Sequence, residues 1–328
     1  MTAQPSFLGS YLSPLRPFLI AEDVVEVVVN PDGQVWVERQ GQSHMQKCAG
    51  VLITPAEAQN LAQAIASEVG VQFSDKKPVV SGKIIDHGVP LRAQVIATPI
   101  VEGGSAIALR RYSHRKIELD AIGLLHGKLV DLDGLRHQRA NEVVTLADAG
   151  DIADAMQLCV EDRLNVVISG GTSTGKTTFA RGLLALVDPL ERIITIEDAF
   201  ELFPEQQNSV ALKADRASNG ERTPAKLLEA SLRMRPDRII LGELRGEESK
   251  TFLEAINTGH GGSFTTVHAD TGRKAIDRLA LMVMSTGINM SFEEVRRYCA
   301  TSIDVVVQLG RESGRRGVAE VYLPGVGG

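Results

Sequence analysis

The sequence predicts an α/β protein in which a parallel-sheet domain follows a smaller mixed α+β domain. From about residue 138 onward, short apolar segments alternate with helical patterns, as in a doubly wound sheet. One of these segments runs through a glycine-rich stretch into a helix, at residues 166–184. The first 112 residues instead contain several strand patterns joined by turns. We therefore predict domains at 1–112 and 138–328, with a linker that contains a short helix at 113–137.

Strand patterns dominate the predicted N-terminal domain. VVEVVVN and QVWVER flank a Pro-Asp-Gly turn at 31–33, which is typical of two paired strands. A Thr-Pro-x-Glu signature at 54–57 begins a helix that we expect to end near residue 69. LRAQVIATPI and SAIALRRY are two further strand candidates. Apolar residues between 7 and 19 recur at helical spacing, but Pro14 and Pro17 exclude one long helix.

The rest of the chain alternates between helix and buried strand. We expect helices at 151–161, 176–187, 223–234 and 247–257, and strands at 164–169, 192–197, 238–242 and 262–268. The polar segment KADRASNGERT at 213–223 is rich in turn residues, so we predict that it is mobile. DVVVQL and VAEVYL form a last strand pair, joined by the basic tip GRESGRRG. The default interpretation of this tip is a solvated turn, and contact with a partner is the alternative.

The glycine-rich segment predicts a phosphate-binding loop. Gly170 to Thr177 fits G-x-x-x-x-G-K-[ST] between a buried strand and a helix, where inward-turned backbone N–H groups and the helix N-terminus attract phosphate. Lys176 would lie along the β- and γ-phosphates, and the Thr177 hydroxyl would complete the coordination of Mg²⁺. The predicted cradle comprises Gly170, Gly171, Thr172, Ser173, Thr174, Gly175, Lys176, Thr177 and Thr178. The guanine-reading motif Asn-Lys-x-Asp does not occur, so we expect ATP as the nucleotide.

Polar residues end three later strands. Glu197 follows ERIITI, Glu243 follows RIILG with Arg245 two residues on, and His268 ends TGHGGSFTTVH. The carboxyl ends of parallel strands share one edge of a sheet, so Glu197, Glu243 and His268 should converge on one Mg-nucleotide. Phosphoryl transfer needs such groups, because water must be oriented and the charge developing on the γ-phosphate must be met. His260 lies between glycines, and bracing the loop and catalysis are equally open for it.

Composition limits the alternatives. With 43% hydrophobic and 23% charged residues the chain is globular, and its net charge of −6 gives no indication of stable nucleic-acid binding. The three cysteines are widely spaced, which fits a reducing cytoplasm better than a disulfide framework. No apolar run approaches the roughly 18 residues of a membrane span. Peripheral association with a membrane stays open.

Four motifs, in order, carry a resemblance to a known family. GGTSTGKTT, TIEDAFEL, SLRMRPDRIILGELRG and NTGHGGSFTTVHA resemble the P-loop, Asp box, acidic Walker B strand and His box of the type IV secretion and conjugation traffic ATPases. The likeness covers residues 138–310 closely and the N-terminal part, around NPDGQVWVERQG, more loosely. It implies a RecA-like, hexameric ATPase at the cytoplasmic face of the inner membrane, whose partners are channel proteins and coupling ATPases.

The resemblance also implies a role for two N-terminal arginines. Arg92 and Arg110 would contact the γ-phosphate and move with domain closure, with Arg111 of lesser weight. The residues by themselves indicate only strands that carry basic side chains. The chain departs from the family pattern at Leu91, where an acid is usual, and at Tyr112, where proline is usual.

We assign provisional roles to the predicted catalytic residues. Glu243 would polarise the attacking water and Glu197 would hold Mg²⁺ through its hydration shell, although the family pattern permits the reverse. His268 would sense the γ-phosphate. Arg245 would act within its own subunit or across a subunit boundary.

Several other functions stay open at this point. A type II secretion or pilus assembly motor often carries a paired-CxxC metal module, which this chain lacks, whereas pilus retraction motors lack it too. A scaffold that binds nucleotide without turnover requires that the acids do not converge. A DNA-translocating helicase is disfavoured by the acidic charge balance. The exported substrate, whether DNA, protein or pilin, is not indicated by these motifs.

Overall fold

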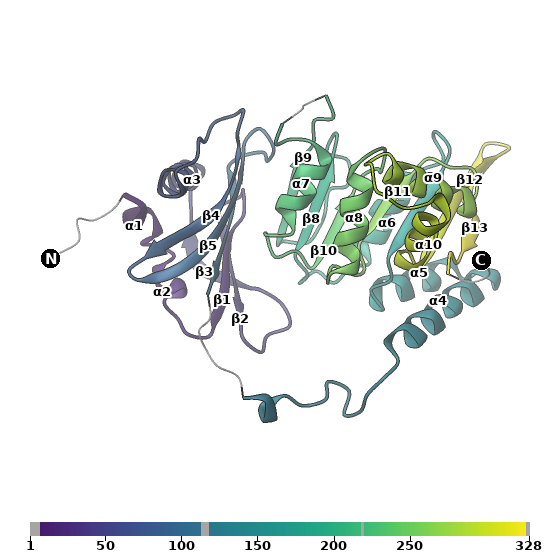
Figure 1. Cartoon of the computed structure of the whole chain (residues 1–328), viewed down its shortest axis with the longest axis horizontal. Helices are drawn as coiled ribbons and strands as arrows, with labels where there is room; N and C mark the ends of the chain where they lie inside the picture. The colour runs from purple at the N-terminus through teal and green to yellow at the C-terminus, as the bar shows by residue number, and fades with distance from the viewer. Residues whose placement is uncertain (1–6, 113–117, 218–219, 326–328) are drawn as a thin grey trace. The chain divides into compact units, whose positions relative to one another are not determined.

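The structure is a computed structural model that describes residues 7–112, 118–217 and 220–325 (Figure 1). Its contacts group the chain into two compact units. The first unit contains residues 1–112 and 187–260, and the second contains residues 113–186 and 261–328. The α/β fold class is confirmed, whereas the predicted domain boundaries stay a prediction.

The N-terminal part of the first unit is a six-stranded antiparallel sheet with helices on one face. The strand order is β3-β2-β1-β6-β5-β4. The strands are β1 (Val24–Val29), β2 (Gln34–Arg39), β3 (Gln46–Leu52), β4 (Val79–Asp86), β5 (Val89–Ala97) and β6 (Ser105–Arg111). Alternate residues of β1 point to opposite faces, so Val27 and Val29 join the large core while Val28 packs with Trp36.

Helices α1 (Phe7–Leu12), α2 (Arg16–Leu19) and α3 (Pro55–Val69) supply the other side of that core. Two short helices replace one long helix at 7–19, as the prolines required. Thr54 and Glu57 form the capping box that starts α3, and Gly70, with φ of 77°, ends it.

Three parallel strands form the remainder of the first unit, in the order β10-β8-β9. They are β8 (Ile193–Glu197), β9 (Ser209–Lys213) and β10 (Arg238–Leu241), and the helices are α7 (Pro224–Ser231) and α8 (Glu248–Asn257). Every residue of β8 and β10 is buried, as expected for strands covered on both faces.

A buried arginine joins these strands to the N-terminal sheet. Arg192 has no exposed surface, and its Nη1 donates to the side-chain oxygens of Asn30, at 2.7 Å, and Asn208. Its Nε donates to the carbonyl of Met234 at 2.9 Å. Burial lowers the pKa of Arg192 to about 10, partly offset by the nearby charge of Glu26. These bonds fix the N-terminal sheet against the β10-β8-β9 strands.

The second unit contains the strands β13-β12-β7-β11 in that order. They are β7 (Val166–Gly170), β11 (Phe264–Val267), β12 (Val305–Glu312) and β13 (Arg315–Tyr322). β7 is parallel to β11 and β12, and β13 returns antiparallel to β12. The helices are η1 (Leu119–Ala121), α4 (Leu132–Asp148), α5 (Ile152–Glu161), α6 (Lys176–Ala185), α9 (Gly272–Met284) and α10 (Phe292–Ser302).

The sequence predicted only a short helix within 113–137, whereas α4 runs from Leu132 to Asp148. Its N-cap is Asp131, whose side chain accepts a hydrogen bond from the backbone N–H of Gly134 at 3.0 Å. Residues 132–137, which we assigned to the linker, are therefore helical.

Candidate functional site

The phosphate-binding loop leaves β7 through a turn that requires glycine. A Cβ placed on Gly170 would lie 2.4 Å from Thr174 Oγ1 and 3.0 Å from the carbonyl oxygen of Leu309. Thr174 Oγ1 donates to the carbonyl of Gly171 at 3.0 Å and so closes the loop. Ser173 and Gly175 have left-handed φ values of 61° and 97°. These features hold the loop at the start of α6, where backbone N–H groups lack partners within the helix.

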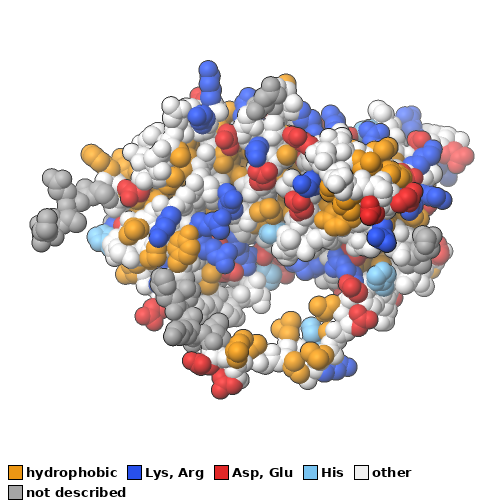
Figure 2. All heavy atoms as spheres, viewed as in Figure 1, with side chains coloured by type: hydrophobic (Ala, Val, Ile, Leu, Met, Phe, Trp, Pro, Cys, Tyr) orange, Lys and Arg blue, Asp and Glu red, His pale blue; other side chains and the backbone are white. Residues whose placement is uncertain are grey.

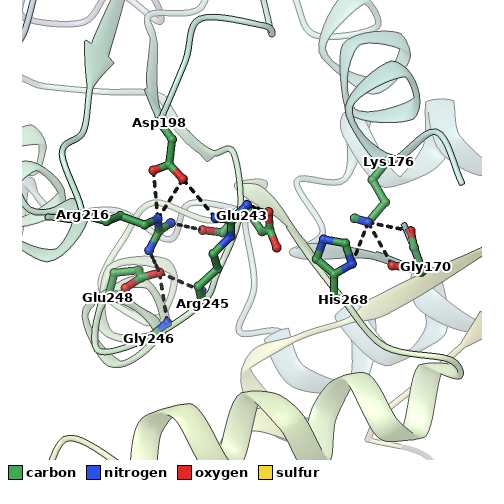
Figure 3. A network of polar contacts seen from close by, with 10 residues as sticks. Gly170, Lys176, Asp198, Arg216, Glu243, Arg245, Gly246, Glu248 and His268 are labelled. Atoms are coloured by element: carbon green, nitrogen blue, oxygen red, sulfur yellow. Dashed lines mark hydrogen bonds and ion pairs between the residues drawn. The ribbon is translucent and has the colours of Figure 1, made fainter. Parts of the chain in front are cut away.

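Lys176 and His268 contact each other at this loop (Figure 3). Lys176 Nζ donates to the carbonyl oxygens of Gly170 and Gly171, both at 2.9 Å. It also lies 3.4 Å from Nδ1 of His268. Because an ammonium group can only donate, Nδ1 must accept in that contact, which places the imidazole proton on Nε2.

Glu197 is the last residue of β8, and both of its carboxylate oxygens accept hydrogen bonds. Oε1 accepts from Thr195 Oγ1 at 3.0 Å, and Oε2 accepts from the backbone N–H groups of Glu201 and Leu202 at 2.8 and 2.9 Å. Burial raises the pKa of Glu197, while these hydrogen bonds lower it. Glu197 therefore fixes the loop that follows its own strand.

Glu243 follows β10, the strand beside β8, so Glu197 and Glu243 stand at one edge. Between them, a Cβ on Gly242 would lie 3.4 Å from Glu197 Cγ. Glu243 Oε2 accepts from Arg245 Nη2 at 2.6 Å, and Arg245 Nη1 lies 3.6 Å from Asp198 (Figure 3). Arg245 is half-exposed, whereas Glu243 is only 16% exposed.

Arg216, which sequence reasoning missed, organises this edge (Figure 3). Its Nε donates to both oxygens of Asp198 at 2.9 Å, its Nη1 to Glu248 at 2.8 Å, and its Nη2 to the carbonyl of Glu243 at 2.8 Å. The buried carboxylate of Glu248 also accepts from the backbone N–H of Arg245 at 2.8 Å. The 213–223 segment is thus anchored in the part that is described, whereas we had expected it to be mobile.

Arg92 and Arg110 line a basic pocket in the first unit. They stand opposite each other on β5 and β6, and Arg233 and Arg235 join them around a cavity of about 240 Å³. Glu26, the acid of this pocket, is buried, and burial together with the charge of Glu38 raises its pKa to about 7. His260 lines the same pocket.

Neighbouring residues have structural contacts instead. Arg111 donates to the carbonyl of Ala21. His260 Nδ1 lies 3.3 Å from the carbonyl oxygen of Ala255, which favours the loop-bracing interpretation of this residue.

An apolar pocket of about 540 Å³ adjoins the phosphate loop within the second unit. Thr174, Gly175 and Thr178 line one end, and the apolar side chains of Met156 and Phe179 line the walls. This volume is typical of small-molecule sites. The pocket could not be predicted from the sequence, because its walls come from four separate elements: α5, α6, β12 and the start of β13.

The predicted site residues thus form three groups: Lys176 with His268, Glu197 with Glu243 and Arg245, and Arg92 with Arg110. Their convergence on one nucleotide stays a prediction. Among the described residues, no group of three or more His, Cys, Asp or Glu side chains is placed to hold a metal ion.

Comparisons with known proteins show the family to which the chain is similar. Residues 135–317 match the family described as "Type II/IV secretion system protein". Conjugal transfer protein TrbB of Rhizobium radiobacter is 33% identical over 301 residues, 91% of this chain and 83% of the relative. VirB11 of Bartonella quintana is 31% identical over 333 residues, 95% and 91% of the two chains. The crystal structure of the Brucella suis VirB11 ATPase in complex with sulphate is 31% identical, with a TM-score of 0.84 and coverage of 96% and 94%.

The pKa of Glu26 generates a prediction about stability. A carboxyl group whose pKa rises from 4.5 to about 7 on folding stabilises the fold below pH 4.5, and this contribution is lost as the pH rises through 7. Glu26→Gln should remove this decrease in stability with rising pH, because glutamine does not ionise. The unfolding free energy of the variant, relative to the parent, should rise by up to about 3 kcal/mol between pH 4.5 and 7. Urea unfolding at several pH values measures this difference.

The matched control is Glu22→Gln, which changes an exposed carboxylate at the start of the same segment. Its difference from the parent should not vary with pH by more than about 0.5 kcal/mol. An equally flat difference for Glu26→Gln would contradict the prediction.

Proposed function

Because this chain belongs to the type II/IV secretion system protein family, in its type IV secretion and conjugation branch, we propose that it is a Mg²⁺-dependent ATPase that drives export. The export takes place through a type IV secretion or conjugative transfer system. The observation that carries this proposal is the loop in which Gly170 and Gly171 hold the ammonium group of Lys176 beside His268.

ATP and Mg²⁺ fit this loop by the chemistry of its donors. The tight turn at Gly170 presents backbone N–H groups to an anion, and the Lys176 ammonium group supplies a positive charge at the same place. The apolar pocket beside Thr178 has room for a base. The Thr177 hydroxyl, with Glu197 acting through water, would hold Mg²⁺. When bound, Mg²⁺ would supply positive charge that offsets the negative charge of the phosphates.

Glu243 is the better candidate for orienting the attacking water. Both oxygens of Glu197 already accept hydrogen bonds that fix its loop, whereas the described hydrogen bond to the Glu243 carboxylate comes from the half-exposed Arg245. Release of Arg245 would leave the Oε2 oxygen of Glu243 able to accept a hydrogen bond from water. Arg245, once released, carries positive charge for the γ-phosphate.

The basic pocket supports a role for Arg92 and Arg110. Four arginines face one carboxylate there, so the pocket carries excess positive charge. The γ-phosphate of a bound nucleotide would offset this positive charge. His268, at the phosphate loop, would sense the γ-phosphate. We propose that Arg92 and Arg110 reach the nucleotide when the N-terminal domain closes.

The working form is proposed to be a homo-hexamer at the cytoplasmic face of the inner membrane, in contact with channel proteins and coupling ATPases. No helix within the described parts of the chain is long and apolar enough to cross a membrane, so contact with the membrane would be peripheral. Acidic and basic side chains are interspersed over the face shown in Figure 2, and we propose no stable nucleic-acid binding.

Glu243→Gln should separate a motor from a nucleotide-binding scaffold. Removing a general base lowers turnover by about 10²- to 10⁴-fold, while the amide keeps the shape of the side chain and ATP still binds. Steady-state hydrolysis of Mg-ATP and titration with ATP measure the two effects. Glu247→Gln, which changes an exposed acid at the start of α8, is the control and should retain parental turnover. Parental turnover in Glu243→Gln would overturn the assignment.

Arg92→Ala and Arg110→Ala should each reduce kcat by on the order of 10³-fold and leave the protein folded, because charge-stabilising arginines in such sites contribute this much. Steady-state kinetics and circular dichroism together provide the measurement. Lys83 pairs with Arg92 across the strands but does not line the pocket, so Lys83→Ala is the control. Unchanged kinetics in both arginine variants would count against closure.

A further inference from the structure

The apolar pocket beside the phosphate loop contains one charged side chain among its lining residues, Arg316. This arginine comes from β13, in the basic tip that we interpreted from sequence as a solvated turn. Its Cδ lies 3.9 Å from the position of a Cβ on Gly175, the residue directly before Lys176. The hairpin therefore brings a guanidinium group to the phosphate loop.

The hairpin of β12 and β13 carries two arginines that face each other. Arg311 stands directly opposite Arg316 in the antiparallel register of β12 and β13. The side chains of Arg311 and Arg316 make no ion pair or hydrogen bond with any residue that the structure describes. Like charges directly opposite each other destabilise a strand pair, so an anion bound between them and the loop would be stabilising.

The loop residues that line the pocket indicate which part of a bound nucleotide would enter it. Thr174, Gly175 and Thr178 line the pocket, whereas Lys176 does not, so the pocket meets the loop on the side away from the Lys176 ammonium group. Lys176 serves the β- and γ-phosphates. The group that crosses from the loop into the apolar pocket is then the α-phosphate with its ribose.

We propose that Arg316 binds the α-phosphate and ribose side of the nucleotide, an inference that rests on the ATP site proposed above. The guanidinium group has five N–H donors in a planar fork that matches phosphate oxygens. The α-phosphate keeps its charge throughout hydrolysis. Arg316 therefore contributes equally to ground-state and transition-state binding, and its loss changes KM rather than kcat.

The test compares Arg316→Ala, Arg316→Lys and Arg315→Ala with the parent. Arg315 is exposed on the same hairpin and does not line the pocket. Arg316→Ala should raise the Kd of Mg-ADP, measured by calorimetry, and the KM for ATP by about tenfold, with kcat within about twofold. Arg316→Lys should give an intermediate value, because it keeps the charge without the fork. Arg315→Ala should match the parent.

Pyrophosphate separates this role from a general disturbance of the loop. It lacks ribose and occupies the Lys176 side, so its inhibition constant should change by less than about twofold in Arg316→Ala. Equal weakening of ADP and pyrophosphate binding in Arg316→Ala would overturn the inference. An ADP affinity of Arg316→Ala equal to that of a parent protein that binds ADP would overturn it as well. A parent protein that neither binds ADP nor hydrolyses ATP would instead overturn the proposed function, and this inference with it.

Discussion

The chemistry proposed for this protein depends on the turn at Gly170 and Gly171. That turn is possible only because no side chain stands between the loop, Thr174 and the Leu309 carbonyl. It also directs two carbonyl oxygens at Lys176 and so fixes where the positive charge lies. Every other role assigned here, from His268 to the arginine of the C-terminal hairpin, is defined relative to that charge and the amide groups around it.

The acidic side chains near the proposed site in the first unit have basic partners within the protein. Arg245 holds Glu243, Arg216 holds Asp198 and Glu248, and Glu26 faces the arginines of the basic pocket. A buried or half-buried charge needs such a partner in the absence of substrate. Under the proposed function, a bound nucleotide would exchange some of these pairs for its own phosphates, and binding would be coupled to rearrangement. This coupling is what a motor requires.

The strand ends were predictable because each combines an apolar, β-branched run with a polar residue at its exit, as in the run that ends at Glu197. Arg216 was not, because it lies in a polar segment without periodicity and gains its role only through acids 18 to 32 residues away. Glu26 was hidden in an apolar strand whose pattern gives no indication of the arginines around it. The length of α4 was missed because only two residues of the whole helix are buried, so the sequence shows no apolar periodicity there.

The central claim is that Glu243 and Lys176 act on the same triphosphate. A structure of the protein with Mg²⁺ and a non-hydrolysable ATP analogue tests it most directly. The account predicts Lys176 on the phosphates and the Glu243 carboxylate about 3 Å from a water positioned for attack on the γ-phosphate. A nucleotide held by Lys176 with Glu243 still paired to Arg245 and remote from the γ-phosphate would contradict the account.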